Sequence, residues 1–235
     1  MRTTLAALMV VGLCASVMAQ SPDAKPDAKL VKRVEAAAAV LKDIRAVPEK
    51  DIPQSLWSKA SCVAVIPGLK RGAFVVGGEF GKGLVSCRNS GAWTAPVFIE
   101  LEKGSWGFQI GAEEVDLVLL VMNDRGIEHL LQDKFTLGTQ ASVAAGPVGR
   151  DAQAATDAKM QAEILSWSRS RGVFAGINIS GGVIKPDNDD NRDLYGREIT
   201  PRDALTGSKM QTPAAARPFI AALREHDSAT TTTRR

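Results

Sequence analysis

The chain has 235 residues, 45% of them hydrophobic, and its 29 basic and 26 acidic residues leave a formal net charge of +3. This length and apolar content are enough for one domain with a substantial core. The charge is too small for the strongly basic face that duplex nucleic acid requires, so we expect no nucleic-acid partner. The 2 histidines have no catalytic partner nearby in the sequence, which argues against acid–base or zinc chemistry.

The first 19 residues have the composition of a secretory signal peptide. Arg2 gives a positive start, residues 5–13 form a short apolar run, and small residues precede a cleavage position after Ala19. The run is shorter than the roughly 20 apolar residues that span a bilayer. We therefore expect an exported protein that is periplasmic or envelope-associated after cleavage. Lipidation of Cys14 is an alternative that the large Leu13 directly before it disfavours.

The sequence predicts a first helix over residues 28–46, after a flexible Pro- and Asp-rich tether at residues 20–27. Apolar residues recur at helical spacing along it, and Pro48 ends it. Five cations lie largely off the apolar stripe: Lys29, Lys32, Arg33, Lys42 and Arg45. The helix either lies on a membrane with its cations toward lipid phosphates or packs on the body of the domain.

Short apolar runs from residue 62 onward alternate with Gly-rich and basic segments, which is typical of antiparallel strands joined by tight turns. Strands are expected at residues 62–66, 73–80, 84–88, 97–101, 106–111 and 117–122. This spacing places Lys70 and Arg71 at one turn and Lys82 at another. Cations at such turns either bind anionic head groups or serve solubility and edge protection.

The rest of the chain completes an α+β pattern. We expect a helix from Asp124 to Gln132, a strand over residues 136–145, a hairpin over residues 164–184, and closing helices at residues 203–205 and 214–223. Residues 226–235 have nothing to bury and are expected to be disordered. The predicted fold is one domain over residues 28–225, a twisted antiparallel sheet that closes toward a barrel and is flanked by helices.

Cys62 and Cys87 are the cysteines that remain after signal cleavage. In an oxidising compartment they either form a disulfide or stay buried as free thiols, because the sequence does not supply the distance between their Cα atoms. Their spacing is not Cys-x-x-Cys, so we do not expect a redox-catalytic pair.

Two glycine-containing segments are similar in composition to loops that bind anions. In residues 146–150, GPVGR, backbone amides near Gly149 together with Arg150 form either a phosphate site or a structural turn. Residues 78–83, GEFGKG, lack the spacing and the Ser or Thr of a nucleotide-binding loop. We therefore predict no cofactor.

Residues 187–198 partly imitate a calcium loop. Asp187, Asp189, Asn191 and Glu198 fall at positions one, three, five and twelve of that pattern. Arg192 stands at the sixth position, where the sharp turn needs glycine. We therefore favour a polar loop and predict no metal site.

Five segments, in this order, resemble the SYLF domain family: GEFGKG at 78–83, GAWTAPVF at 91–98, FQIGAEEVDLVLLVMN at 108–123, AAGPVGR at 144–150 and SWSRSRGVFAGINISGG at 166–182. The resemblance covers about residues 30–225. It implies a lipid-binding module, which in eukaryotic members recognises phosphoinositides beside SH3 or FYVE domains. It also implicates the N-terminal amphipathic segment in lipid contact. Because a secretory signal stands here in place of such partner domains, we expect binding to anionic lipid or membrane surfaces in general.

The combined prediction is a secreted, non-catalytic, membrane-associated phospholipid-binding protein of the bacterial envelope. The predicted lipid- or anion-binding residues are Lys29, Lys32, Arg33, Lys70, Arg71, Lys82, Gly149 and Arg150. One alternative is a structural or interaction module that docks an envelope protein. A metal-dependent hydrolase that uses the acids of residues 187–198 has the least support.

Overall fold

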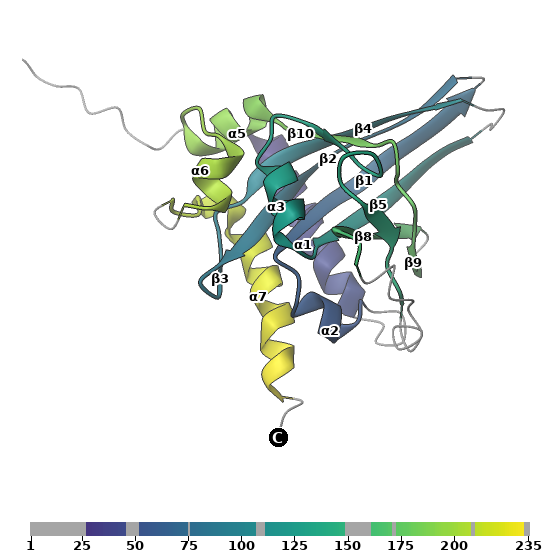
Figure 1. The fold of residues 1–235 in the computed structure, drawn as a ribbon. Coiled ribbons are helices and arrows are strands. Elements are labelled where there is room, and N and C mark those ends of the chain that lie inside the picture. The colour runs from purple at the N-terminus through teal and green to yellow at the C-terminus, as the bar shows by residue number, and fades with distance from the viewer. Residues whose placement is uncertain are drawn as a thin grey trace, which may run out of the picture.

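The computed structural model describes residues 27–45, 52–74, 76–106, 111–148, 161–170, 173–207 and 210–232. The fold is α+β, with a strongly curled, half-barrel-like sheet flanked by helices (Figure 1). This confirms the predicted fold class. The expected signal peptide and most of the tether lie outside the described residues.

The helical elements are α1 (Ala28–Arg45), α2 (Gln54–Trp57), α3 (Asp124–Leu130), α5 (Asn188–Tyr195), α6 (Pro201–Leu205), the 3-10 turn η3 (Ala214–Ala216) and α7 (Arg217–Thr232). The strands are β1 (Cys62–Phe74), β2 (Val76–Asn89), β3 (Ala92–Trp93), β4 (Val97–Trp106), β5 (Gly111–Val121), β6 (Phe135–Thr136), β7 (Val143–Ala145), β8 (Ile164–Ser170), β9 (Val173–Gly176) and β10 (Val183–Pro186). Their order in the sheet is β6-β10-β4-β2-β1-β5-β8-β7, with β3 beside β2 and β9 beside β8. None of the described helices is long and apolar enough to cross a bilayer.

The central strands bury side chains on both faces of the sheet. Along β1, Val63 and Val65 join the apolar cluster that includes α1 and α7. The alternate residues Ala64 and Ile66 join a second cluster on the other face. A strand buried on both faces needs apolar residues at every position, which explains the unbroken apolar runs in the sequence.

The first helix packs on the domain along its apolar stripe. Leu30, Val34 and Leu41 are each at most 1% exposed, and they share a cluster with Phe219 and Leu223 of α7. The helix was expected over residues 28–46 and spans Ala28–Arg45, so its predicted bounds are correct to within one residue. The apolar side chains of this helix thus belong to the core of the domain, as the second of its two interpretations expects.

The turns predicted at Lys70–Arg71 and at Lys82 are wrong. Lys70 and Arg71 lie inside β1, and Lys82 lies inside β2, opposite Glu100 of β4. The register between β1 and β2 shifts between Val65 and Lys70, so β1 passes through an irregularity there without ending.

The glycines beside Lys82 permit a close approach between strands. A Cβ added at Gly81 would come within 2.6 Å of Cγ2 of Ile66, and one at Gly83 would overlap the carbonyl oxygen of Val65. A glycine required for such packing looks the same in sequence as a glycine required for a turn, which is the origin of the wrong prediction.

Two segments expected to be irregular are helical. Residues 188–195 form α5, and Asp187 caps it by accepting a hydrogen bond from the backbone N–H of Asp190. The last helix continues to Thr232, so the expected disorder from residue 226 onward is wrong for residues 226–232. His226 is only 3% exposed and stacks on Trp57, which gives this end of the helix something to bury. The helix expected from Asp124 is present as α3, and the side chain of Asn123 caps it by accepting a hydrogen bond from the backbone N–H of Gly126.

Cys62 and Cys87 face each other across β1 and β2 and form a disulfide. Both are nearly fully buried, in the cluster on the face opposite α1. Between the two alternatives that the sequence left open, the structure therefore has the bonded pair.

We predict that replacing both cysteines by Ala lowers the free energy of unfolding by about 2–4 kcal/mol, because the bond closes a loop of 25 residues in the unfolded chain. Urea denaturation of the oxidised wild type and the double variant measures this difference. A reducing agent should shift the wild-type midpoint and leave the variant's midpoint unchanged. Equal midpoints for the two oxidised proteins would contradict the prediction.

Candidate functional site

A groove of about 590 Å³ lies between α1 and the strands β1 and β2. This volume is within the range of small-molecule sites, about 300–1,000 Å³. Its lining combines apolar and cationic side chains with one carboxylate, that of Asp116, and comes from α1, β1, β2, β5 and β8. The apolar part is formed by Ala36, Ala39, Val40, Pro67 and Phe80. The cationic part is formed by Lys32, Arg33, Lys70, Lys82 and Arg169.

The groove brings together four of the predicted anion-binding cations, Lys32, Arg33, Lys70 and Lys82, although they come from three different elements. Lys29 does not line it, nor does Arg71, which lies 3.6 Å from Glu79 across β1 and β2. Gly149 and Arg150 lie outside the described residues.

Sequence reasoning missed Arg169 as a groove residue. It lies on β8, where its Nε donates to Asp116 of β5 at 2.9 Å, and it also pairs with Asp43 of α1. The basic SWSRS segment was a visible signal, but nothing local in the sequence indicates that β8 reaches this groove.

Only some of the groove cations carry uncompensated charge. Arg33, Lys82 and Arg169 each form ion pairs with two or more carboxylates. Lys32 and Lys70 are exposed, and their ammonium groups form no hydrogen bond or ion pair with any residue that the structure describes. They are therefore the cations available to an anionic ligand.

The apolar lining of the groove includes an exposed aromatic ring. Phe80 is 45% exposed and stands opposite Lys70 in the register of β1 and β2. Within the described part of the chain, Val173 is the other large apolar side chain with comparable exposure. Ala36 and Ala39 of α1 add exposed methyl groups to the same surface. The groove thus offers apolar contact directly beside available positive charge.

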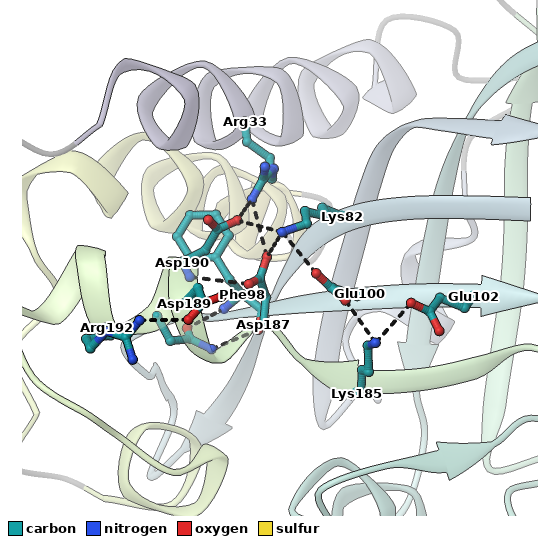
Figure 2. Close-up of polar contacts among 11 residues, drawn as sticks. Arg33, Lys82, Phe98, Glu100, Glu102, Lys185, Asp187, Asp189, Asp190 and Arg192 are labelled. Carbon is teal, nitrogen blue, oxygen red and sulfur yellow. Dashed lines mark hydrogen bonds and ion pairs between the residues drawn. The ribbon is translucent and has the colours of Figure 1, made fainter.

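A network of charged side chains begins at Arg33 and Lys82, which form one wall of the groove, and joins α1, β2, β4, β10 and α5 (Figure 2). Lys82 Nζ lies 2.6 Å from Oδ2 of Asp187 and 2.9 Å from Oε1 of Glu100. Arg33 pairs with Asp190 and lies 3.8 Å from Asp187. On the far side, Lys185 joins Glu100 to Glu102.

Burial and these neighbours shift the proton affinities of the wall residues. Burial raises the pKa of Asp187 to about 6; the hydrogen bond to Asp190 adds to this rise, while the one from Lys82 opposes it. Burial alone would also raise the pKa of Asp190, but its hydrogen bonds with Asp187 and Arg33 outweigh that effect and lower it. For Lys82, burial would lower the pKa, but hydrogen bonds to Asp187 and Glu100 raise it above the ordinary value.

The four residues of the calcium-like pattern do not converge on one point. Asp187 faces Lys82, and Asn191 is buried, where its side chain bonds the backbone N–H and carbonyl of Phe98. Asp189 and Glu198 are exposed and lie near Arg192. Among the residues that the structure describes, no cluster of His, Cys, Asp or Glu is arranged to hold a metal ion.

Residues 102–226 match the family model Ysc84, described as Las17-binding protein actin regulator. The chain is 35% identical over 176 residues to the SH3 domain-containing protein PJ696.02 of Schizosaccharomyces pombe, a match covering 73% of this chain and 40% of that protein. It is 34% identical over 194 residues to the rat SH3 domain-containing YSC84-like protein 1, covering 80% and 56% respectively. It is 32% identical over 173 residues to the YSC84 protein of Saccharomyces cerevisiae, covering 72% and 36%. The chain thus spans between about a third and just over a half of the length of these relatives.

We predict that Lys82→Met lowers the free energy of unfolding by about 1–3 kcal/mol, because it leaves the buried carboxylate of Asp187 and the partly buried one of Glu100 without their shared donor. Lys70→Met is the matched control and should change stability by less than about 0.5 kcal/mol, since the exposed ammonium group of Lys70 bonds no described residue. Chemical denaturation at pH 7.5 compares the two variants with wild type. Equal effects of both changes would contradict the assignment of Lys82 to the network.

Proposed function

The chain belongs to the Ysc84, or SYLF domain, family, and we propose that it is a non-catalytic protein that binds anionic lipid through the groove beside α1. The observation that carries this proposal is that two lysines, Lys32 and Lys70, lie next to an exposed apolar surface that includes Phe80. The ammonium groups of both lysines have no ion-pair partner among the described residues. A phospholipid combines these two properties, because its phosphate is anionic and its acyl chains are apolar.

In the proposed complex, a lipid phosphate accepts hydrogen bonds from the ammonium groups of Lys32 and Lys70. Such charge-assisted bonds are stronger than neutral ones, and each cation near an anionic surface contributes about 1 kcal/mol. The apolar part of the lipid contacts Phe80 and the methyl groups of Ala36 and Ala39, and it gains about 25 cal/mol for each Å² removed from water. Arg33 and Lys82 form the wall of the groove and remain bound to their carboxylates.

The groove supports surface contact and argues against insertion of α1. Leu30, Val34 and Leu41 of α1 are in the core, so insertion into the bilayer would require the helix to leave the sheet. The ion pairs from Arg33 to Asp190 and from Asp43 to Arg169 also hold the two ends of α1 in place.

We further propose that the protein acts in an exported compartment of the bacterial envelope. The signal-like composition of residues 1–19 and the Cys62–Cys87 disulfide both support this location, because disulfides persist mainly in oxidising compartments.

A protein partner is the second candidate, because the matching family model is described as an actin regulator. It predicts binding to a protein of envelope extracts and indifference to lipid composition. The vesicle experiment below separates the two candidates.

We predict that the double change Lys32→Glu and Lys70→Glu weakens binding to phosphatidylglycerol vesicles at least about tenfold at low salt, because two favourable charge contacts become repulsive. Co-sedimentation with phosphatidylglycerol and phosphatidylcholine vesicles measures this effect. The double change Lys42→Glu and Lys59→Glu is the control matched in charge, since both lysines are exposed outside the groove. Undiminished binding by the double variant would rule out the groove, and no binding of wild type to either vesicle would favour the protein partner.

A second prediction concerns the apolar contact. Phe80→Ser should weaken binding to the same vesicles about threefold to tenfold at high salt, where apolar burial outweighs screened charge. Val173→Ser is the control because Val173 is equally exposed but does not line the groove. If both variants lose the same amount of binding, the apolar contact is not specific to the groove.

A further inference from the structure

Two carboxyl groups that do not themselves line the groove pair with two of the cations that do. Asp187 is 4% exposed, and its Oδ2 lies 2.6 Å from Nζ of Lys82. Asp190 pairs with Arg33 and has its Oδ2 3.5 Å from the same Nζ. Arg33 and Lys82 line the groove, so these two carboxylates cancel positive charge that a ligand in the groove would otherwise meet (Figure 2).

The charges that face this pair are nearly balanced. Arg33 approaches from α1, Lys82 from β2, Glu100 from β4 and Lys185 from β10, beyond Glu100. Glu102 bonds only the outer side of Lys185, and the Asp189–Arg192 pair of α5 lies in solvent. One additional proton therefore changes the net charge of the wall from about zero to about +1.

We propose that the Asp187–Asp190 pair is a proton-binding switch: by taking up one proton, it unmasks positive charge on Arg33 and Lys82 and strengthens the binding of anionic lipid in mildly acidic medium. This inference rests on the proposed function of the groove. The proton comes from solvent and resides on Asp187, and no bond other than this O–H bond is made or broken.

Asp187 is the member of the pair that takes the proton. Two adjacent carboxylates resist simultaneous ionisation, and burial adds to this resistance at Asp187, whose pKa is raised to about 6. Asp190 keeps its charge because Arg33 and the hydrogen bond with Asp187 lower its pKa. The Arg33–Asp190 pair is then retained, so α1 stays attached to α5 while the charge of the wall changes.

The acid form of the switch remains folded. A carboxyl group whose pKa rises from 3.8 to about 6 on folding contributes stability that is fully present below 3.8 and is lost as the pH rises through about 6. Protonation of Asp187 therefore favours the folded state. The 2 histidines of the chain lie elsewhere, His129 on α3 near Glu163 and His226 beneath Trp57, and neither lines the groove.

The test measures binding of wild type, Asp187→Asn and Asp189→Asn to phosphatidylglycerol vesicles at pH 7.5 and pH 5.0. The phosphodiester of this lipid stays ionised over that range, so only the protein changes charge. Asn preserves the cap of α5 while removing the titratable group. Asp189→Asn is the matched control because Asp189 is exposed on the same helix outside the groove.

We expect wild type to bind about fivefold more tightly at pH 5.0, since one unit charge near an anionic surface is worth about 1 kcal/mol. Asp187→Asn should bind at both pH values as tightly as wild type does at pH 5.0, and Asp189→Asn should retain the wild-type pH dependence. The proposed switch would be wrong if wild type bound equally well at both pH values, or if Asp187→Asn kept the pH dependence of wild type. Wild type that binds at neither pH would instead overturn the proposed function.

Carboxyl ¹³C shifts of the wild-type protein provide a second readout, which needs no lipid. One aspartate is expected to titrate near pH 6, and its signal should be absent from the spectrum of Asp187→Asn. If every aspartate of the wild type titrates below pH 5, the switch does not exist.

Discussion

The packing of α1 across the curled sheet is the contact on which the candidate site depends. Its buried stripe forms one side of the core with α7 and the central strands. Because a helix laid on a sheet leaves its upper side exposed, the residues at the margin of that stripe face β1 and β2 across the groove. The same contact that stabilises the domain therefore supplies one side of the groove. The ion pairs Arg33–Asp190 and Asp43–Arg169 connect α1 to α5 and to β8.

Charge pairing divides the basic residues of the groove into two groups with different roles. Arg33, Lys82 and Arg169 connect elements of the fold through carboxylates, whereas Lys32 and Lys70 are exposed at the opening. A count of positive residues would overstate the attraction for anions, since the wall is nearly neutral when its carboxyl groups are ionised. The raised pKa of Asp187 makes this neutrality dependent on pH, because the proton that it accepts shifts the wall toward positive charge.

The family match and the groove draw on largely different parts of the chain. The Ysc84 match covers residues 102–226, whereas several groove residues, including Lys32, Lys70 and Phe80, precede that range. The curated relatives that carry SH3 domains in their names are longer than this chain, which spans about half of the rat protein. The charge and the apolar surface of the groove come from elements of one sheet-and-helix unit.

The sequence by itself determined the α+β class, the bounds of α1 and the family, since each depends on local periodicity or on motif order. It also supplied four of the groove cations, but it placed Lys70 and Lys82 at turns, because glycines for tight strand packing resemble glycines for turns. The pairing of the cations came only from the tertiary structure: Arg33 and Asp190 are 157 positions apart, and Lys82 and Asp187 are 105 positions apart. Whether a cation is available to a ligand depends on contacts over such separations, which no local pattern in the sequence encodes.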